Sequence, residues 1–340
     1  MKERDIVKLT HQYYKKGKRL VAPLLGFPGV ELTGSNIKLA QQNFGEHYKV
    51  IKAVVNRFKP DIIFPLMDLS VEANALGRYT IFPQEDSATV PKRQFFLEEI
   101  NKLKEVNISY DSRVLSYVET MKLMSVGLPD DVIRGAYITG PYSAAALMMG
   151  ADDAAMTSVT DPEKLHLLCE FTAEKIREYA NLLISAGAEV ICILEPTAVT
   201  LGPQQFEKFS ADYIKHIINS IHYSGVSTIY HTCGNTMHLI EKMLDSGINA
   251  ISLDSEEMGV DLKKVADMVP EDIVVMGNIN PSTTMLRGTE KDVAEKTKNL
   301  LEQMKDFPNY ILSTGCDLPQ ETPPGNISAF IETGRNWTAI

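Results

Sequence analysis

Short apolar runs rich in β-branched residues recur along the chain, and polar or helical stretches separate them. Most of these runs are continuous rather than alternating, which is typical of strands buried on both faces of a parallel sheet. They predict eight strands: Leu20–Gly26, Asp61–Asp68, Arg134–Pro141, Glu189–Pro196, Ser227–Gly234, Ala250–Glu256, Ile273–Asn280 and Tyr310–Asp317. The first run is the weakest candidate, because Pro23 stands inside it and cannot donate a hydrogen bond to a neighbouring strand.

Helical patterns lie between the predicted strands. Asp161 and Pro162 are typical of a helix start, and an apolar stripe follows them up to Gly187. The alternation of strands and helices predicts an α/β fold, a (β/α)8 TIM barrel that forms one domain over residues 1–340. A doubly wound sheet is the alternative, but the chain lacks the glycine-rich first turn that is typical of it.

The connection from Gly77 to Gly127, after the second predicted strand, is longer than usual. It contains two helical patterns, KRQFFLEEINKLKEV and RVLSYVETMKLMSVG. We expect this long helical insertion to lie over one mouth of the barrel or to form an arm between the subunits of a homodimer. The residues before Leu20 form an N-terminal extension.

Composition and charge narrow the function classes. Hydrophobic residues make up 44% of the 340 residues, an ordinary globular proportion, and the net charge of -10 disfavours a nucleic-acid partner. No apolar run approaches the ~20 residues of a membrane helix, so we expect no membrane partner. The charged N-terminus lacks the apolar core of a signal peptide, so we expect a cytoplasmic location. The four cysteines are too few for a disulfide scaffold.

Three residues of the kinds that bind metal ions lie at the ends of two predicted strands. His231 and Cys233 end the fifth predicted strand two positions apart, so both side chains point to the same side. Cys316 ends the eighth and can approach from across the ring. One imidazole and two thiolates are a favourable zinc set that leaves a fourth position open for substrate. The alternative is that each is an ordinary buried residue, since the HxC motif alone is weak.

Other polar residues end the predicted strands, where a barrel of this kind places its active site. Glu195 is a candidate fourth zinc ligand, or a base beside the zinc, and the alternative is a capping or ion-paired glutamate. Asp68 is either functional or the cap of the next helix. Asp254, Asn278 and Asn280 are candidates for cofactor binding, and they could equally be turn residues.

Longer motifs resemble a known family. EPTAVTLGPQQFEKF, YHTCGNTMHLIEKMLDSGINAISLD, VVMGNINP and LSTGCDLPQETPPGNISAF follow one another to the C-terminus. Together they resemble the uroporphyrinogen decarboxylase family, and more closely its cobalamin-dependent methyltransferase branch, which includes methylcobamide:coenzyme M methyltransferase. PDIIFPLMDLSVEANALG is a weaker match, in which Asp68 stands where the decarboxylases keep a catalytic aspartate. The decarboxylases have N-terminal arginines that are missing here and a histidine in place of Cys316.

The resemblance implies a cofactor and partners. It implies that His231, Cys233 and Cys316 hold a zinc ion (Zn²⁺), which binds a thiol acceptor and lowers the pKa of that thiol. It also implies a corrinoid (cobalamin) carried by a small partner protein. The implied function is a zinc-dependent corrinoid methyltransferase, an enzyme that moves a methyl group between that protein and a small molecule, most simply a thiol.

Three alternatives remain open. A methyl donor such as a methoxylated aromatic or a methylamine could methylate cob(I)alamin, with Glu195, Asp68 or Tyr142 supplying a proton. Uroporphyrinogen decarboxylation is a second alternative, for which the arginines are missing. A non-catalytic zinc-binding barrel is the third, and it leaves the open coordination position without a purpose.

Overall fold

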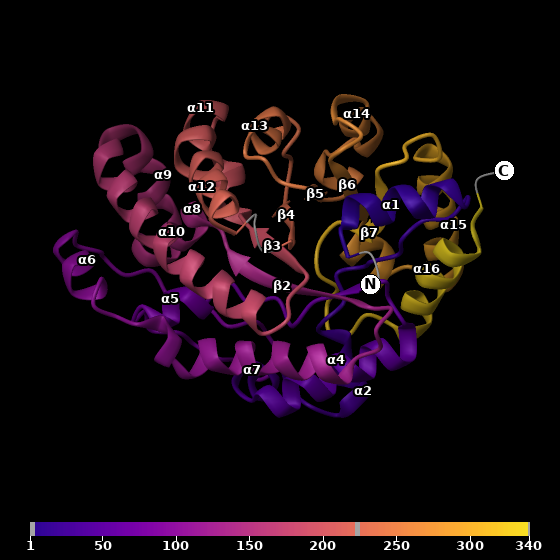
Figure 1. The fold of residues 1–340 in the computed structure, drawn as a ribbon, viewed down its shortest axis with the longest axis horizontal. Helices are drawn as coiled ribbons and strands as arrows, with labels where there is room; N and C mark the ends of the chain where they lie inside the picture. Colours follow the sequence, from indigo (N-terminus) through magenta and orange to yellow (C-terminus); the bar gives the residue numbers. More distant parts are fainter. Residues whose placement is uncertain (1–3, 222–224, 339–340) are drawn as a thin grey trace.

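The computed structural model describes residues 4–221 and 225–338 (Figure 1). Within these residues, seven parallel strands form one sheet, and their order in the sheet follows their order in the sequence. The strands are β1 (Ile62–Ile63), β2 (Ile133–Thr139), β3 (Val190–Leu194), β4 (Ser227–Thr232), β5 (Ala250–Leu253), β6 (Val274–Ile279) and β7 (Tyr310–Thr314). Every residue of these strands is buried, as their continuous apolar character predicts.

Helices surround the curved sheet and connect its strands (Figure 1). In the first part of the chain these are α1 (Ile6–Lys15), α2 (Pro28–Thr33), α3 (Ile37–Gln42), α4 (Phe44–Phe58), α5 (Val71–Ala75), α6 (Glu98–Leu103), η1 (Ile108–Tyr110), α7 (Ser112–Gly127), α8 (Pro141–Met149), α9 (Ala151–Thr160) and α10 (Pro162–Ser185). The second part contains η2 (Pro196–Thr200), α11 (Pro203–Phe206), η3 (Glu207–Ala211), α12 (Asp212–Ile221), α13 (Ile240–Asp245), η5 (Glu256–Met258), α14 (Leu262–Met268), η6 (Pro281–Leu286), α15 (Glu290–Gln303) and α16 (Pro324–Asn336).

The two faces of the sheet pack into different cores. Alternate strand residues such as Cys192 and Ile229 form an inner cluster enclosed by the curve of the sheet. The residues between them, such as Ile193 and Tyr230, pack against the surrounding helices. This alternation decides which side chains beyond the strand ends face the interior.

The prediction of a strand at Leu20–Gly26 is wrong in part, because this segment forms only one isolated bridge, between Val21 and Leu312. The segment still lies between the last strand and the first. The Ala22 N–H donates to the Leu312 carbonyl at 2.9 Å, and the Asp61 N–H donates to the Val21 carbonyl at 3.0 Å. Pro23 has no N–H to continue the ladder, which explains why the pairing stops there.

The long segment after β1 divides into two parts. Helix α7 packs against α4, α10 and β2, and so occupies the place of an ordinary crossover helix outside the sheet. Residues 85–88 instead line a cavity together with Met67, Leu69 and Asp317, all of which follow strand ends. Residues 85–88 therefore lie at the mouth of the sheet, where the carboxyl ends of the strands lie.

The opposite end of the sheet is covered by α1. Ile6 belongs to the inner cluster, and its N–H donates to Ser227 Oγ at the start of β4 at 3.2 Å. The inner core is therefore covered at the amino ends of the strands, and access to it lies at the carboxyl ends. Among the described residues, no helix combines the length and the apolar character that crossing a membrane requires.

Candidate metal centre

His231 and Cys233 reach the interior because of the alternation along β4. Ile229 belongs to the inner cluster, and residues two and four positions further on point the same way. His231 is almost fully buried, and Cys233 is partly exposed at the mouth. One strand end thus presents an imidazole and a thiol side by side.

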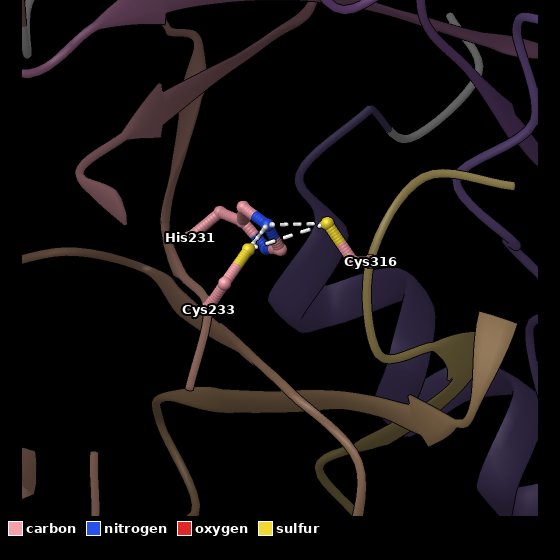
Figure 2. A group of neighbouring side chains, drawn as sticks. All are labelled: His231, Cys233 and Cys316. Carbon is pink, nitrogen blue, oxygen red and sulfur yellow. Dashed lines mark hydrogen bonds between the residues drawn. The ribbon is translucent and has the colours of Figure 1, made fainter. Parts of the chain in front are cut away.

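Cys316 completes the group from the loop that follows β7 (Figure 2). Its Sγ lies 3.2 Å from Cys233 Sγ and 3.7 Å from His231 Nε2, and Cys233 Sγ lies 3.3 Å from the same nitrogen. Both cysteines are free thiols. Among the described residues, these three are the group of histidine, cysteine and carboxylate side chains that could hold a metal ion.

The neighbouring thiol and burial both oppose ionisation of Cys316. The hydrogen bond with Cys233, together with burial, raises the pKa of the Cys316 thiol well above its usual range. A metal ion stabilises the thiolate form of its cysteine ligands and so reverses this direction.

Ser252 orients the histidine. It is paired with His231 across β4 and β5, and its Oγ lies 3.0 Å from His231 Nδ1. A hydrogen bond from Nδ1–H to this oxygen leaves the lone pair of Nε2 directed at the two sulfur atoms. Ser252 is not among the residues predicted for the site, although it lies two residues before Asp254 on the same face of its strand.

The three candidates for cofactor binding hold the loops around the metal group. The Asp254 carboxylate accepts hydrogen bonds from the backbone N–H of Gly234 at 2.8 Å and of Ser255 at 2.7 Å. Asn278 donates to the Asp254 carbonyl at 2.9 Å, and Asn280 donates to Ser255 Oγ at 2.9 Å. Asp254 therefore binds directly to the loop that contains Cys233, through the Gly234 N–H.

The Glu195 carboxylate is not part of the metal group. It accepts hydrogen bonds from the backbone N–H of Tyr142 at 3.0 Å and of Ser143 at 2.8 Å, at the start of α8, and from Ser210 Oγ at 2.9 Å. Its position continues the face of β3 that packs against the helices, which carries Ile191 and Ile193. Burial raises the pKa of Glu195 to about 7.

Asp68 and Tyr142 are also directed elsewhere. The Asp68 side chain is fully buried in an ion pair with Arg113 of α7, and it accepts a hydrogen bond from Tyr117 Oη at 3.0 Å. Tyr142 is fully buried at the start of α8, and burial raises the pKa of its hydroxyl to about 12. The group of His231, Cys233 and Cys316 includes neither Asp68 nor Tyr142.

Asp317, the residue after Cys316, borders both the metal group and a cavity of about 550 Å³. One of its carboxylate oxygens accepts hydrogen bonds from the N–H groups of Gly26 and Leu318, while Oδ2 is buried without a hydrogen-bond partner. Burial raises the pKa of Asp317 to about 7. In the sequence, only its place directly after Cys316 indicates that Asp317 lies beside the metal group.

The described residues form a curved parallel sheet with a His–Cys–Cys group at its mouth, the arrangement of a barrel-like protein with a candidate metal site. Comparisons with known proteins identify the family. Residues 32–337 match the family described as uroporphyrinogen decarboxylase (URO-D). The chain belongs to the URO-D family.

Two relatives and one solved structure place the chain within this family. It is 31% identical over 244 residues to the methylcobamide:CoM methyltransferase MtbA of Methanosarcina acetivorans, covering 71% of this chain and 69% of the relative. It is 25% identical over 300 residues to a uroporphyrinogen decarboxylase of Prochlorococcus marinus, covering 86% and 84%. The fold is similar to that of a methyltransferase from Methanosarcina mazei, with a TM-score of 0.82, 21% identity and coverage of 96% and 98%. The predicted resemblance and the predicted class of enzyme, a methyltransferase, are confirmed.

Proposed function

We propose that this chain is a zinc-dependent corrinoid methyltransferase that transfers a methyl group between a corrinoid protein and a small thiol. The observation that carries the proposal is the convergence of His231 Nε2, Cys233 Sγ and Cys316 Sγ within 3.7 Å of one another. The similarity to a relative named as a methylcobamide:CoM methyltransferase supports the corrinoid partner.

The donor atoms suit zinc. Tetrahedral coordination with ordinary zinc bond lengths separates two sulfur ligands by about 3.8 Å, and a nitrogen and a sulfur by about 3.6 Å. The three separations here, from 3.2 to 3.7 Å, need only small adjustments to reach these values. Three protein ligands leave one tetrahedral position for an external ligand, which is typical of a catalytic rather than a structural zinc site.

Each residue of the site has a definite task in this proposal. His231, held by Ser252, offers a neutral imidazole nitrogen, and Cys233 and Cys316 offer thiolates. Asp254 keeps the Cys233 loop in place through the Gly234 N–H. A zinc ion bound there would lower the pKa of an added thiol, and the buried inner cluster beneath the site keeps water away from one side of it.

A thiol acceptor is better supported than a methyl ether donor. An ether would need an acid beside its oxygen. The three residues proposed for that role have other partners or positions: Asp68 pairs with Arg113, Glu195 binds the start of α8, and Tyr142 is fully buried. A thiol needs no such acid, because only its own proton has to leave.

Zinc analysis of Cys316→Ala tests the metal assignment. We expect the wild-type protein to bind one zinc per chain and the variant to lose most of it, because among the described residues no fourth histidine, cysteine or carboxylate belongs to the group. Cys169→Ala removes a buried thiol of α10 and serves as the control, with full zinc expected. Full zinc occupancy in Cys316→Ala would contradict the assignment.

An absorbance assay tests the reaction. The zinc-loaded protein is mixed with a methylated corrinoid protein and a small thiol, and demethylation of the corrinoid is followed in the visible spectrum. We expect thiol-dependent demethylation with the wild type and with Cys169→Ala, and none with Cys316→Ala. Methylation of cob(I)alamin by a methoxylated aromatic or a methylamine, without any reaction of thiols, would favour the opposite direction.

A further inference from the structure

We propose that the small substrate of this site carries a positively charged ammonium group, and that anionic thiols are poor substrates. The inference rests on the proposed function and adds the charge class of the substrate. It is carried by the cavity beside Cys316 and by the distribution of charge around the mouth of the sheet.

The cavity has apolar and acidic walls and no basic residue. Phe27, Ile37, Met67, Leu69 and Leu318 supply apolar surface. Four of its lining residues are acidic: Glu85, Asp86, Asp317 and Glu321. Its volume of about 550 Å³ suits a small molecule. Asp317 joins the cavity to the metal group, because the preceding residue is Cys316.

The loops that directly follow the strands also lack cations. The residues that directly follow each strand include no Lys or Arg, and the next cation after β6 is Arg287. These residues are 64–70, 140–150, 195–202, 233–238, 254–261, 280–286 and 315–323. The same segments contain many carboxylates, among them Asp254, Glu256 and Glu257. An anionic headgroup beside the metal group would therefore find no cationic side chain on any of these loops.

Four cations of the long segment after β1 have partners outside the cavity. Lys92 pairs with Asp153, Arg93 with Glu99, and Arg113 with Asp68. Arg78 Nη2 donates to the carbonyls of Pro91 and Arg93 at 3.5 Å, while its Nε and Nη1 are buried without a hydrogen-bond partner. None of these four residues lines the cavity.

Charge balance then favours a cationic substrate. A zinc ion with two thiolates and one imidazole is neutral, and an added thiolate makes the centre anionic. A sulfonate or carboxylate on that thiol adds a second negative charge near the acidic wall, at a Coulombic cost. An ammonium group is attracted instead, and methyl groups on its nitrogen can pack against Phe27 and Met67.

Asp317 supplies a second observation that points to such a ligand. Its Oδ2 is buried and accepts no hydrogen bond, which is unfavourable for a carboxylate oxygen unless a partner arrives. A positively charged group in the cavity would be that partner.

The reaction is the methylation of an ammonium thiol by a methylated corrinoid. The electron pair of the thiolate sulfur forms the new S–CH₃ bond, and the Co–C bond breaks with its pair left on cobalt. Cobalt(III) becomes cobalt(I), and the thiol proton goes to solvent. The ammonium group takes no part in the bond changes and only sets affinity.

Calorimetric titration of the zinc-loaded protein tests the charge class without turnover. Three thiols of similar length differ in headgroup charge: thiocholine is positive, 2-mercaptoethanol is neutral and 2-mercaptoethanesulfonate is negative. The quaternary nitrogen of thiocholine has no lone pair, so it cannot coordinate zinc. We expect thiocholine to bind about tenfold or more tighter than the sulfonate. Equal or tighter binding of the sulfonate, or no binding of any of the three, overturns the inference.

A matched pair of variants tests the role of the cavity wall. Glu85→Lys reverses an exposed charge on the wall, and Glu105→Lys makes the same change on the same long segment outside the cavity. Glu85→Lys should reduce the preference for thiocholine over the sulfonate by about three- to tenfold, and less in high salt. Glu105→Lys should leave the preference unchanged. Equal effects of the two variants overturn the assignment of this cavity.

Methylation by a methylated corrinoid protein separates the two proposals. Methylation of the sulfonate thiol with a higher kcat/KM than thiocholine overturns the charge class and leaves the proposed function intact. The expected order of affinities without methylation of any thiol supports the charge class and overturns the proposed function.

Discussion

At the scale of the residue, the alternation of side chains along a strand separates the metal group from its neighbours. His231 and Cys233 share the inner face of β4 with Ile229, whereas Glu195 continues the outer face of β3. The first residue after a strand still points to the side that the alternation gives it. A carboxylate at a strand end therefore reaches the metal group only if it lies on the inner face. Applied to β3, the same rule directs Glu195 toward α8 rather than toward the interior.

The hydrogen bond between Ser252 and His231 gives the first prediction at this scale. Ser252→Ala removes the oxygen that holds Nδ1, so the imidazole can change tautomer or rotate. We expect zinc affinity to fall about 10- to 100-fold, measured by competition with a chromophoric chelator. Ser313→Ala is the control, since Ser313 is buried on β7 and donates to the Ala22 carbonyl instead. Equal zinc affinity in Ser252→Ala and wild type would contradict the role of Ser252.

At the scale of the element, two helices begin in the same way and differ in what lies beside them. Gly140 precedes Pro141 of α8 and Gly202 precedes Pro203 of α11, with nearly equal backbone angles of φ -72, ψ 156 and φ -70, ψ 160. The Glu195 side chain packs against Gly140, so that a Cβ there would overlap it. Beside Gly202, a Cβ would meet only Gln205 Oε1, at 3.4 Å. The start of α8 thus requires glycine because of Glu195, while the start of α11 does not.

Alanine at these two glycines gives the prediction at this scale. Gly140→Ala should lower the free energy of unfolding by about 2–4 kcal/mol, because it displaces a buried carboxylate from its hydrogen bonds. Gly202→Ala should be neutral or stabilising by up to about 1 kcal/mol, because it restricts the unfolded chain without a clash. Urea unfolding of both variants measures the difference. Equal stability of the two variants would show that α8 can move away from Glu195.

At the scale of the whole molecule, buried carboxyl groups give an unusual pH dependence of stability. Burial raises the pKa of Glu72, Glu195 and Asp317 to about 7 in each case. The folded chain therefore binds more protons than the unfolded chain between about pH 4.5 and 7. These groups stabilise the fold at the acidic end of that window, and the stabilisation is lost as the pH rises through 7.

The metal-free protein should accordingly be more stable near pH 5.5 than near pH 8, as measured by urea unfolding. Glu72→Gln tests one contribution, because glutamine can still accept from the Thr139 N–H and can hydrogen bond the Thr139 hydroxyl. We expect it to reduce the loss of stability over this range by roughly 2 kcal/mol. Glu105→Gln, on the surface, should leave the pH dependence unchanged. If the free energy of unfolding changed equally with pH in Glu72→Gln and Glu105→Gln, a raised pKa at Glu72 would be contradicted.

The sequence by itself determined the order of the buried strands and the group of His231, Cys233 and Cys316. Both follow from local rules, since a continuous apolar run predicts a buried parallel strand and a parallel sheet gathers its carboxyl ends at one mouth. It also showed the weakness of the Leu20–Gly26 strand, through Pro23. These features depend on neighbours in sequence or on the common direction of the strands.

Only the tertiary structure decided the partners of the candidate carboxylates. Asp68 meets Arg113 across 45 residues, and Glu195 meets the start of α8 across 53. The acidic cavity likewise joins residues 85–88 to residues 317–321. Such contacts arise when loops from distant strands pack together, and no periodicity of the chain specifies them. The convergence of His231, Cys233 and Cys316 could therefore be predicted from their motifs, whereas the residues that surround this group could not.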